Sequence, residues 1–120
     1  MWYSLLDLEM PAPHDIRAHV TVNDDSPWFS GHFPDHPIVP GIAQLKMVAD
    51  VIARARQESL WINRLTRVKF KKIVKPGEHL EILATATNTT GLYSFRITHE
   101  TQDVCSGMMS LDHQQHIECP

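Results

Sequence analysis

The fold is decided by the sequence Gly31-His32-Phe33-Pro34-Asp35-His36-Pro37-Ile38-Val39-Pro40-Gly41. Its three prolines fix φ and remove backbone donors, which predicts a rigid loop and not a helix or a central strand. Gly41 opens the apolar segment that follows and lets a ligand approach the backbone closely. The free N–H groups at the start of a helix attract an anion or a carbonyl oxygen. A histidine held beside such a helix end suits the removal of a proton next to a carbonyl group.

The segment from Gly41 to about Gln57 has the periodicity of a helix. At about 100° per residue one broad arc is apolar, and this arc comprises Ile42, Leu45, Val48, Ala49, Ile52 and Ala53, extended by Met47 and Val51. The polar residues lie on a narrow strip with Lys46, Asp50, Arg54 and Gln57. A helix that is apolar around most of its circumference is expected to be wrapped by other structure.

The rest of the chain shows strand patterns separated by turn signals. Two strands are predicted before the helix, at Tyr3–Met10 and Ile16–Val22, the first stopped by Pro11 and Pro13. Four more are predicted after it, at Trp61–Val74, Glu78–Thr87, Leu92–Glu100 and Val104–Leu111. This order predicts one α+β domain over residues 1–120, with a long antiparallel sheet curled around the helix.

Composition narrows the class of protein. The net charge of −3 argues against nonspecific nucleic-acid binding, which needs a basic surface. No apolar window reaches the roughly 18 residues of a membrane span, so no membrane partner is expected. Two cysteines, Cys105 and Cys119, build no disulfide framework, which favours a reduced, cytoplasmic protein.

Two blocks of the sequence resemble the hotdog-fold β-hydroxyacyl-acyl-carrier-protein dehydratases of fatty-acid synthesis. The first runs from Pro27-Trp28-Phe29-Ser30 through the proline loop to Gly41. The second comprises Val68-Lys69-Phe70-Lys71 and Val74-Lys75-Pro76-Gly77-Glu78-His79-Leu80. The residues Ala43-Gln44-Leu45 also look like the divergent branch found in aryl-polyene-type lipid clusters. The resemblance implies the hotdog fold, in which a long antiparallel sheet wraps one central helix.

The resemblance also implies roles for three residues. His32 matches the histidine that handles the α-proton of the thioester, and Gly41 matches the glycine whose N–H holds the thioester carbonyl. In the family an acidic residue on the central helix of the partner subunit serves the departing hydroxyl. Lys46 occupies that acidic position here, which puts the usual dehydratase mechanism in doubt.

Lys46 allows three interpretations. The site could have lost its acid, with Lys46 reaching from the helix edge toward water. Alternatively, a partly buried ammonium group could protonate the leaving hydroxyl in place of a carboxylic acid. The third interpretation moves the carboxylate one helical turn to Asp50, about 6 Å along the axis, where it would miss a hydroxyl placed for position 46.

Other polar groups suggest weaker hypotheses. His36 and the His113–Cys119 tail raise the question of a metal, but the prolines exclude a helical His pair, so we expect no metal and no cofactor. Six cationic residues lie close together in the sequence: Arg64, Arg67, Lys69, Lys71, Lys72 and Lys75. They form either a solvated strand face or a docking site, whose ligand would be an acidic carrier protein or the phosphates of a phosphopantetheine arm.

These inferences combine into one expectation. The chain should form a hotdog dimer, because the curled sheet leaves an exposed edge that the family closes by pairing two subunits. We expect a dehydratase-like protein that binds a 3-hydroxyacyl group on acyl carrier protein or coenzyme A. His32, Gly41 and Lys46 are the expected catalytic residues, and the expected substrate-binding residues are Phe33, Val39, Pro40, Met47 and Asp50. The alternatives are a catalytically impaired acyl-binding subunit that supports an active homologue in a heteromer and, ranked last, an acyl thioesterase.

Overall fold

The computed structural model of the protein describes residues 2–23 and 39–113. Within them, strands β1 (Tyr3–Ala12) and β2 (Asp15–Val22) precede helix α1 (Gly41–Arg56). Four strands follow the helix: β3 (Leu60–Phe70), β4 (His79–Ala86), β5 (Leu92–His99) and β6 (Gln102–His113). The predicted order of two strands, one helix and four strands is confirmed.

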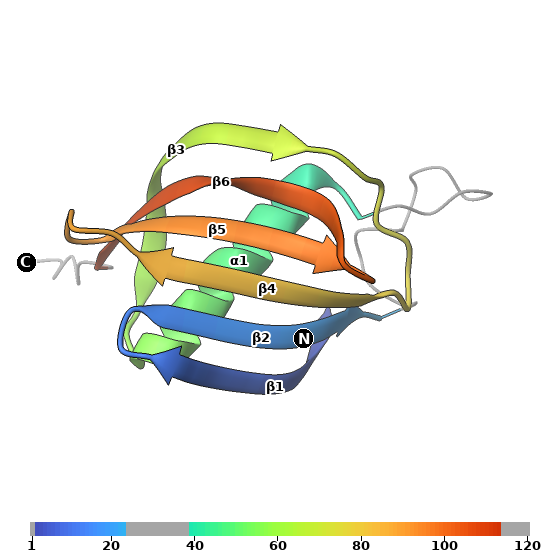
Figure 1. Ribbon diagram of the computed structural model, residues 1–120, viewed down its shortest axis with the longest axis horizontal. Coiled ribbons are helices and arrows are strands. Elements are labelled where there is room, and N and C mark those ends of the chain that lie inside the picture. Colours follow the sequence, from blue (N-terminus) through green and yellow to red (C-terminus); the bar gives the residue numbers. More distant parts are fainter. Residues whose placement is uncertain (1, 24–38, 114–120) are drawn as a thin grey trace, which may run out of the picture.

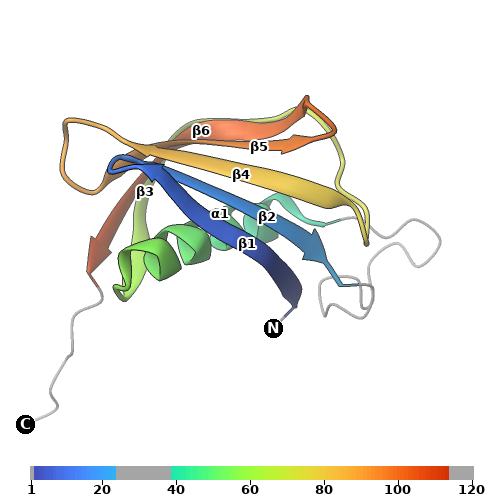
Figure 2. The ribbon, with the colours of Figure 1, turned by 60° about the horizontal axis from the view of Figure 1, so that its bottom comes forward.

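The six strands form one antiparallel sheet in the order β1-β2-β4-β5-β6-β3. Figure 1 shows the sheet in front of α1, and Figure 2 shows the helix lying against the inner face of the curved sheet. The two edge strands are β1 and β3. The predicted α+β architecture, a sheet wrapped around one helix, is therefore confirmed.

The core forms because the strands alternate in polarity and the helix does not. In β2 the side chains of Ile16, Ala18, Val20 and Val22 are almost completely buried, while the residues between them are only half-buried. Helix α1 buries eight residues, among them Met47, Val48, Val51 and Ile52. Burial of a large aliphatic side chain is worth roughly 1.5–3 kcal/mol, so this interface holds helix and sheet together.

Several predicted strand boundaries are wrong, by one to four residues. Strand β1 continues through Pro11 to Ala12, because β1 is an edge strand and tolerates a residue without an N–H group. Strand β3 ends at Phe70 and not at Val74: the N–H groups of Lys71 and Lys72 both donate to the carbonyl of Val104 as the chain leaves the sheet. Strand β6 extends to His113, where it pairs with Leu60.

Two further observations bear on the environment of the protein. Cys105 is a free thiol that is completely buried, and burial raises its pKa to about 11, so it is a poor nucleophile. Cys119 lies outside the described residues, and the cytoplasmic location stays a prediction. In residues 2–23 and 39–113 there is no helix with the length and apolarity needed to cross a bilayer.

Candidate active site at the start of the helix

Helix α1 begins directly after an extended residue that gives it no side-chain cap. Pro40 is the N-cap, with φ −60° and ψ 151°, and no acidic side chain lies in the first turn. The first intrahelical bond runs from the Gln44 N–H to the Pro40 carbonyl at 3.2 Å. The earlier N–H groups of the turn, including that of Gly41, have no such partner inside the helix. This end of the helix can therefore receive the oxygen of a ligand.

Two contacts fix the backbone that leads into the helix. The Val39 N–H donates to the Val74 carbonyl at 2.8 Å, and the Gln44 side-chain amide donates to the Val39 carbonyl at 3.3 Å. Val39 is 3% exposed and Pro40 is half-buried. The helix start is thus tied to the segment after β3 and to its own first turn, which makes its position well defined.

Gly41 packs against the ring of Phe70 at the end of β3. A Cβ atom at position 41 would lie 2.6 Å from Cζ of that ring, so any larger residue would displace Phe70. Gly41 does not have a positive φ, and the structural demand for glycine therefore comes from this close approach. Phe70 is a residue of this site that the sequence did not reveal, because its alternation with Val68 read as an ordinary strand pattern.

An apolar surface surrounds the helix start. Ile42, Phe70 and Ile73 are 60%, 51% and 59% exposed, and the Val39–Val74 hydrogen bond places their two segments side by side. Trp61 and Leu65 of the edge strand β3 are also exposed. Exposed apolar side chains at a helix start and along a sheet edge are typical of a surface that another subunit covers.

Lys46 and Asp50 lie on the same polar strip of the helix but have different surroundings. Lys46 is exposed, which agrees with an ammonium group that reaches solvent. The carboxylate of Asp50 accepts a short hydrogen bond from the Tyr3 hydroxyl of β1 and a bond of 3.2 Å from Nε of Arg54. Asp50 therefore ties the helix to the first strand, which the sequence did not indicate because Tyr3 lies 47 residues away.

The comparisons with known proteins agree with this architecture. A family model described as ApeI-like, ApeI dehydratase, matches residues 9–108. The chain belongs to the ApeI-like dehydratase family.

Curated relatives of this family member are 3-hydroxyacyl-[acyl-carrier-protein] dehydratases called FabZ. The protein from Wolbachia pipientis wMel is 30% identical over 97 residues, covering 74% of this chain and 68% of the relative. The protein from Streptococcus pyogenes serotype M1 is 35% identical over 92 residues, covering 70% of this chain and 65% of the relative. The chain thus spans about two thirds of the length of these relatives.

A solved structure supports the same assignment. The dehydratase heterocomplex ApeI:P from Xenorhabdus doucetiae contains a chain that superposes with a TM-score of 0.82 at 25% identity. The match covers 92% of this chain and 98% of that one. The hotdog fold and the dehydratase family expected from the sequence are therefore confirmed.

Apart from Asp50, which is half-buried and bound by Tyr3 and Arg54, the predicted site residues of this family member divide into three groups. His32 and Phe33 lie outside the described residues. Gly41 and Pro40 lie at the uncapped helix start, and Lys46 is exposed about 7.5 Å further along the axis. Val39 and Met47 are buried in the core, with Met47 at 0% exposure. Their part in substrate binding stays a prediction. No three side chains of the types that bind metals converge within residues 2–23 and 39–113.

Proposed function

We propose that this chain is a subunit of a dehydratase that removes water from a 3-hydroxyacyl thioester on acyl carrier protein or coenzyme A. The observation that carries the proposal is the uncapped helix start at Gly41, in a chain that belongs to a dehydratase family. A helix end with free N–H groups is suited to hold the thioester oxygen, where negative charge develops when the neighbouring carbon loses its proton.

The reaction needs three groups. His32 takes the proton from the carbon next to the thioester carbonyl, since imidazole exchanges protons near neutral pH. The N–H of Gly41 stabilises the charge on the carbonyl oxygen. The electron pair then forms the carbon–carbon double bond, the bond to the hydroxyl breaks, and an acid gives that hydroxyl a proton so that it leaves as water.

The acid that protonates the leaving hydroxyl can come from either of two subunits, which gives two forms of the proposal. In the first, Lys46 of a second subunit donates the proton, because an ammonium group is a competent acid when it is placed beside the leaving oxygen. In the second, a related hotdog subunit supplies a carboxylic acid from its own helix. The name of the ApeI:P heterocomplex describes such a pairing of unlike subunits in that similar protein.

The rival function is that of a supporting subunit that binds the acyl group without turning it over. Two points support it: by the resemblance to the dehydratases Lys46 matches the position of the acid, and the Asp50 carboxylate already accepts hydrogen bonds from Tyr3 and Arg54. A carboxylate engaged in this way is poorly placed to replace the missing acid. The acyl slot would lie between two subunits in either case, lined by Phe33, Pro40 and the apolar surface at Ile42, Phe70 and Ile73.

Purified protein incubated with a 3-hydroxyacyl thioester tests the proposal through the appearance of the enoyl product. Activity that is lost both in His32→Ala and in Lys46→Met supports the enzyme with Lys46 as its acid. An inert parent that gains activity on Lys46→Glu supports a subunit that relies on an acidic partner. Thioester binding without turnover in any variant favours the supporting role and contradicts catalysis by this chain.

A further inference from the structure

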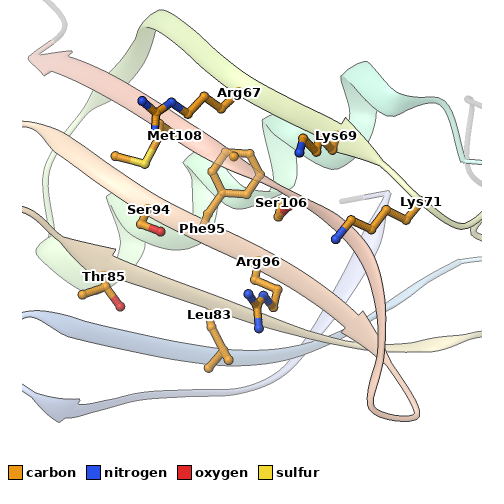
Figure 3. Close-up of a pocket in the computed structure, with 11 residues that line it drawn as sticks. Arg67, Lys69, Lys71, Leu83, Thr85, Ser94, Phe95, Arg96, Ser106 and Met108 are labelled. Atoms are coloured by element: carbon orange, nitrogen blue, oxygen red, sulfur yellow. The ribbon is translucent and has the colours of Figure 1, made fainter.

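A hollow lies on the outer face of the sheet, away from helix α1. Its volume is about 440 Å³, and its lining comes from β3, β4, β5 and β6. Tyr93, Phe95 and Ile97 of β5 are buried in the core, whereas Ser94 and Arg96 between them are exposed. Figure 3 shows the basic side chains of Arg67, Lys69, Lys71 and Arg96 arranged around this hollow. We call it the outer groove.

The positive charge of the outer groove is only partly neutralised. Asp103 is the carboxylate partner of Lys71, at 3.4 Å, and of Arg96, at 3.7 Å. Arg67 and Lys69 make no ion pair with any residue in the described parts of the chain. Four cations that share one carboxylate leave about three net positive charges around one hollow, in a chain whose overall charge is −3. Such a focus of charge attracts a multiply charged anion.

A strained feature of β3 turns Arg67 into the outer groove. Thr66 pairs with Met108 and Lys69 pairs with Ser106, so that Arg67 and Val68 together face Gly107. Arg67 has a φ of 56°, the left-handed region that glycine adopts most easily. Gly107 is needed opposite, because a Cβ there would lie 3.0 Å from Cα of Val68. Bulges and residues held in such conformations concentrate at binding sites, where they aim a side chain.

The other side chains that line the outer groove suit an anion that also carries an organic group. Ser94, Thr85 and Ser106 offer hydroxyl groups, while Leu83 and Met108 offer apolar surface next to the cations. A volume of about 440 Å³ falls within the range of small-molecule sites. A free guanidinium such as that of Arg67 binds phosphate with two parallel hydrogen bonds and also stacks on flat rings.

We propose that the outer groove binds a nucleotide-type ligand with at least two phosphate groups, either as a free nucleotide or as the nucleotide end of coenzyme A. The phosphates lie among Arg67, Lys69 and Arg96, and the base lies on Leu83 and Met108. A phosphodiester on a carrier protein has a single negative charge and fits three net positive charges less well. This proposal goes beyond the proposed function, because it concerns the face of the sheet opposite the helix start.

Titration calorimetry at low salt tests the proposal independently of turnover, with adenosine 3′,5′-bisphosphate, coenzyme A, inorganic diphosphate and adenosine as probes. The bisphosphate is expected to bind, and adenosine to fail. Lys69→Gln should weaken binding about tenfold, as expected for the loss of one charged hydrogen-bond partner. The matched control Lys75→Gln removes the same charge from an exposed residue outside the outer groove and should leave the affinity unchanged.

The two sources of the nucleotide give different supporting results. If coenzyme A binds more tightly than the bisphosphate, the outer groove is a site for the coenzyme. If the two affinities are equal, the outer groove recognises the nucleotide alone. Three results would overturn the proposal: no saturable binding of either compound, equal losses in Lys69→Gln and Lys75→Gln, or inorganic diphosphate binding as tightly as the bisphosphate. Binding of a phosphopantetheinylated carrier protein without binding of the nucleotide would overturn it as well.

Discussion

At the scale of single residues, His19 links three strands through its charge. Its Nδ1 lies 2.7 Å from Asp7 of β1 and its Nε2 lies 3.0 Å from Glu81 of β4. The hydrogen bond to Asp7 raises the pKa of His19 above its ordinary value of 6.5, opposed by burial and assisted by Glu81. The protonated ring satisfies both carboxylates at once, so the charged form is the one that the folded state prefers.

This raised pKa predicts a pH-dependent contribution to stability. The contribution of His19 is fully present below pH 6.5, while the two carboxylates remain ionised, and it is lost as the pH rises through the folded-state pKa. Urea denaturation should therefore show a larger loss of stability for His19→Gln at about pH 6 than at about pH 9. His14→Gln, which alters an exposed ring without an ion pair in the described residues, should show no such difference. A constant loss across this range would contradict the account of His19.

Gly41 supplies a second prediction at the residue scale. Gly41→Ala should displace the Phe70 ring, because the added Cβ would lie 2.6 Å from it. The ring is half exposed and can move, so we expect a stability loss of only about 1 kcal/mol by thermal unfolding, with a larger effect on thioester binding. The double variant Gly41→Ala/Phe70→Ala should recover the stability but should bind the thioester more weakly than Phe70→Ala alone. Binding equal to that of Phe70→Ala alone would show that Gly41 serves packing alone.

At the scale of elements, strained backbone occurs at two places that differ in purpose: a hairpin and a bulge. Glu100 and Thr101 form the hairpin between β5 and β6 with φ values of 50° and 68°, where Asn-Gly is the preferred pair. Arg67 has a similar φ in the bulge of β3. We ascribe the strain at Arg67 to the outer groove, and we see no such use for the strain in the hairpin.

Relieving the two strains should therefore have different consequences. Both Arg67→Gly and Glu100→Asn/Thr101→Gly should stabilise the protein, by about 1 kcal/mol each, because the left-handed region costs L-residues about that much. Chemical denaturation measures this gain. Only Arg67→Gly should also weaken binding of adenosine 3′,5′-bisphosphate. Destabilisation by Arg67→Gly would mean that the arginine side chain contributes more to folding than its backbone strain costs.

The success of the sequence-based prediction also varies by element. The helix (Gly41–Arg56) and β2 were predictable, because the spacing of their apolar residues shows directly which side chains enter the core. The end of strand β3 was predicted four residues too late, because Lys71 and Lys72 leave the sheet through hydrogen bonds to Val104 that no local pattern encodes. The contacts of Phe70 with Gly41 and of Tyr3 with Asp50 join distant segments, and only the folded chain reveals them.

At the scale of the whole molecule, strand β3 is an edge strand of the sheet that residues 2–23 and 39–113 form. Trp61 and Leu65 are exposed on it, and Ile42, Phe70 and Ile73 are exposed near the helix start. We expect a second hotdog subunit, identical or related, to pair along this edge and to close the acyl slot. The outer groove opens on the outer face of the same sheet, so both sites could be occupied in one assembly.

Assembly along β3 can be tested directly. Leu65→Lys places a charge on the edge strand and should convert the expected dimer to monomers in light scattering, with loss of thioester binding. Leu6→Lys makes the same change on the opposite edge strand β1 and should leave the dimer intact. A dimer that survives Leu65→Lys and dissociates with Leu6→Lys would show that the interface lies along β1, which contradicts the assembly along β3.

The central claim is that His32 removes the proton next to the thioester carbonyl while Gly41 holds the carbonyl oxygen. Deuterium exchange at that carbon, followed by mass spectrometry of a 3-hydroxyacyl thioester in heavy water, tests this step even if Lys46 fails to expel the hydroxyl. The protein should introduce deuterium there, and His32→Ala should abolish the exchange. Exchange that persists in His32→Ala, or no exchange with the unaltered chain and its partner subunit, would contradict the account.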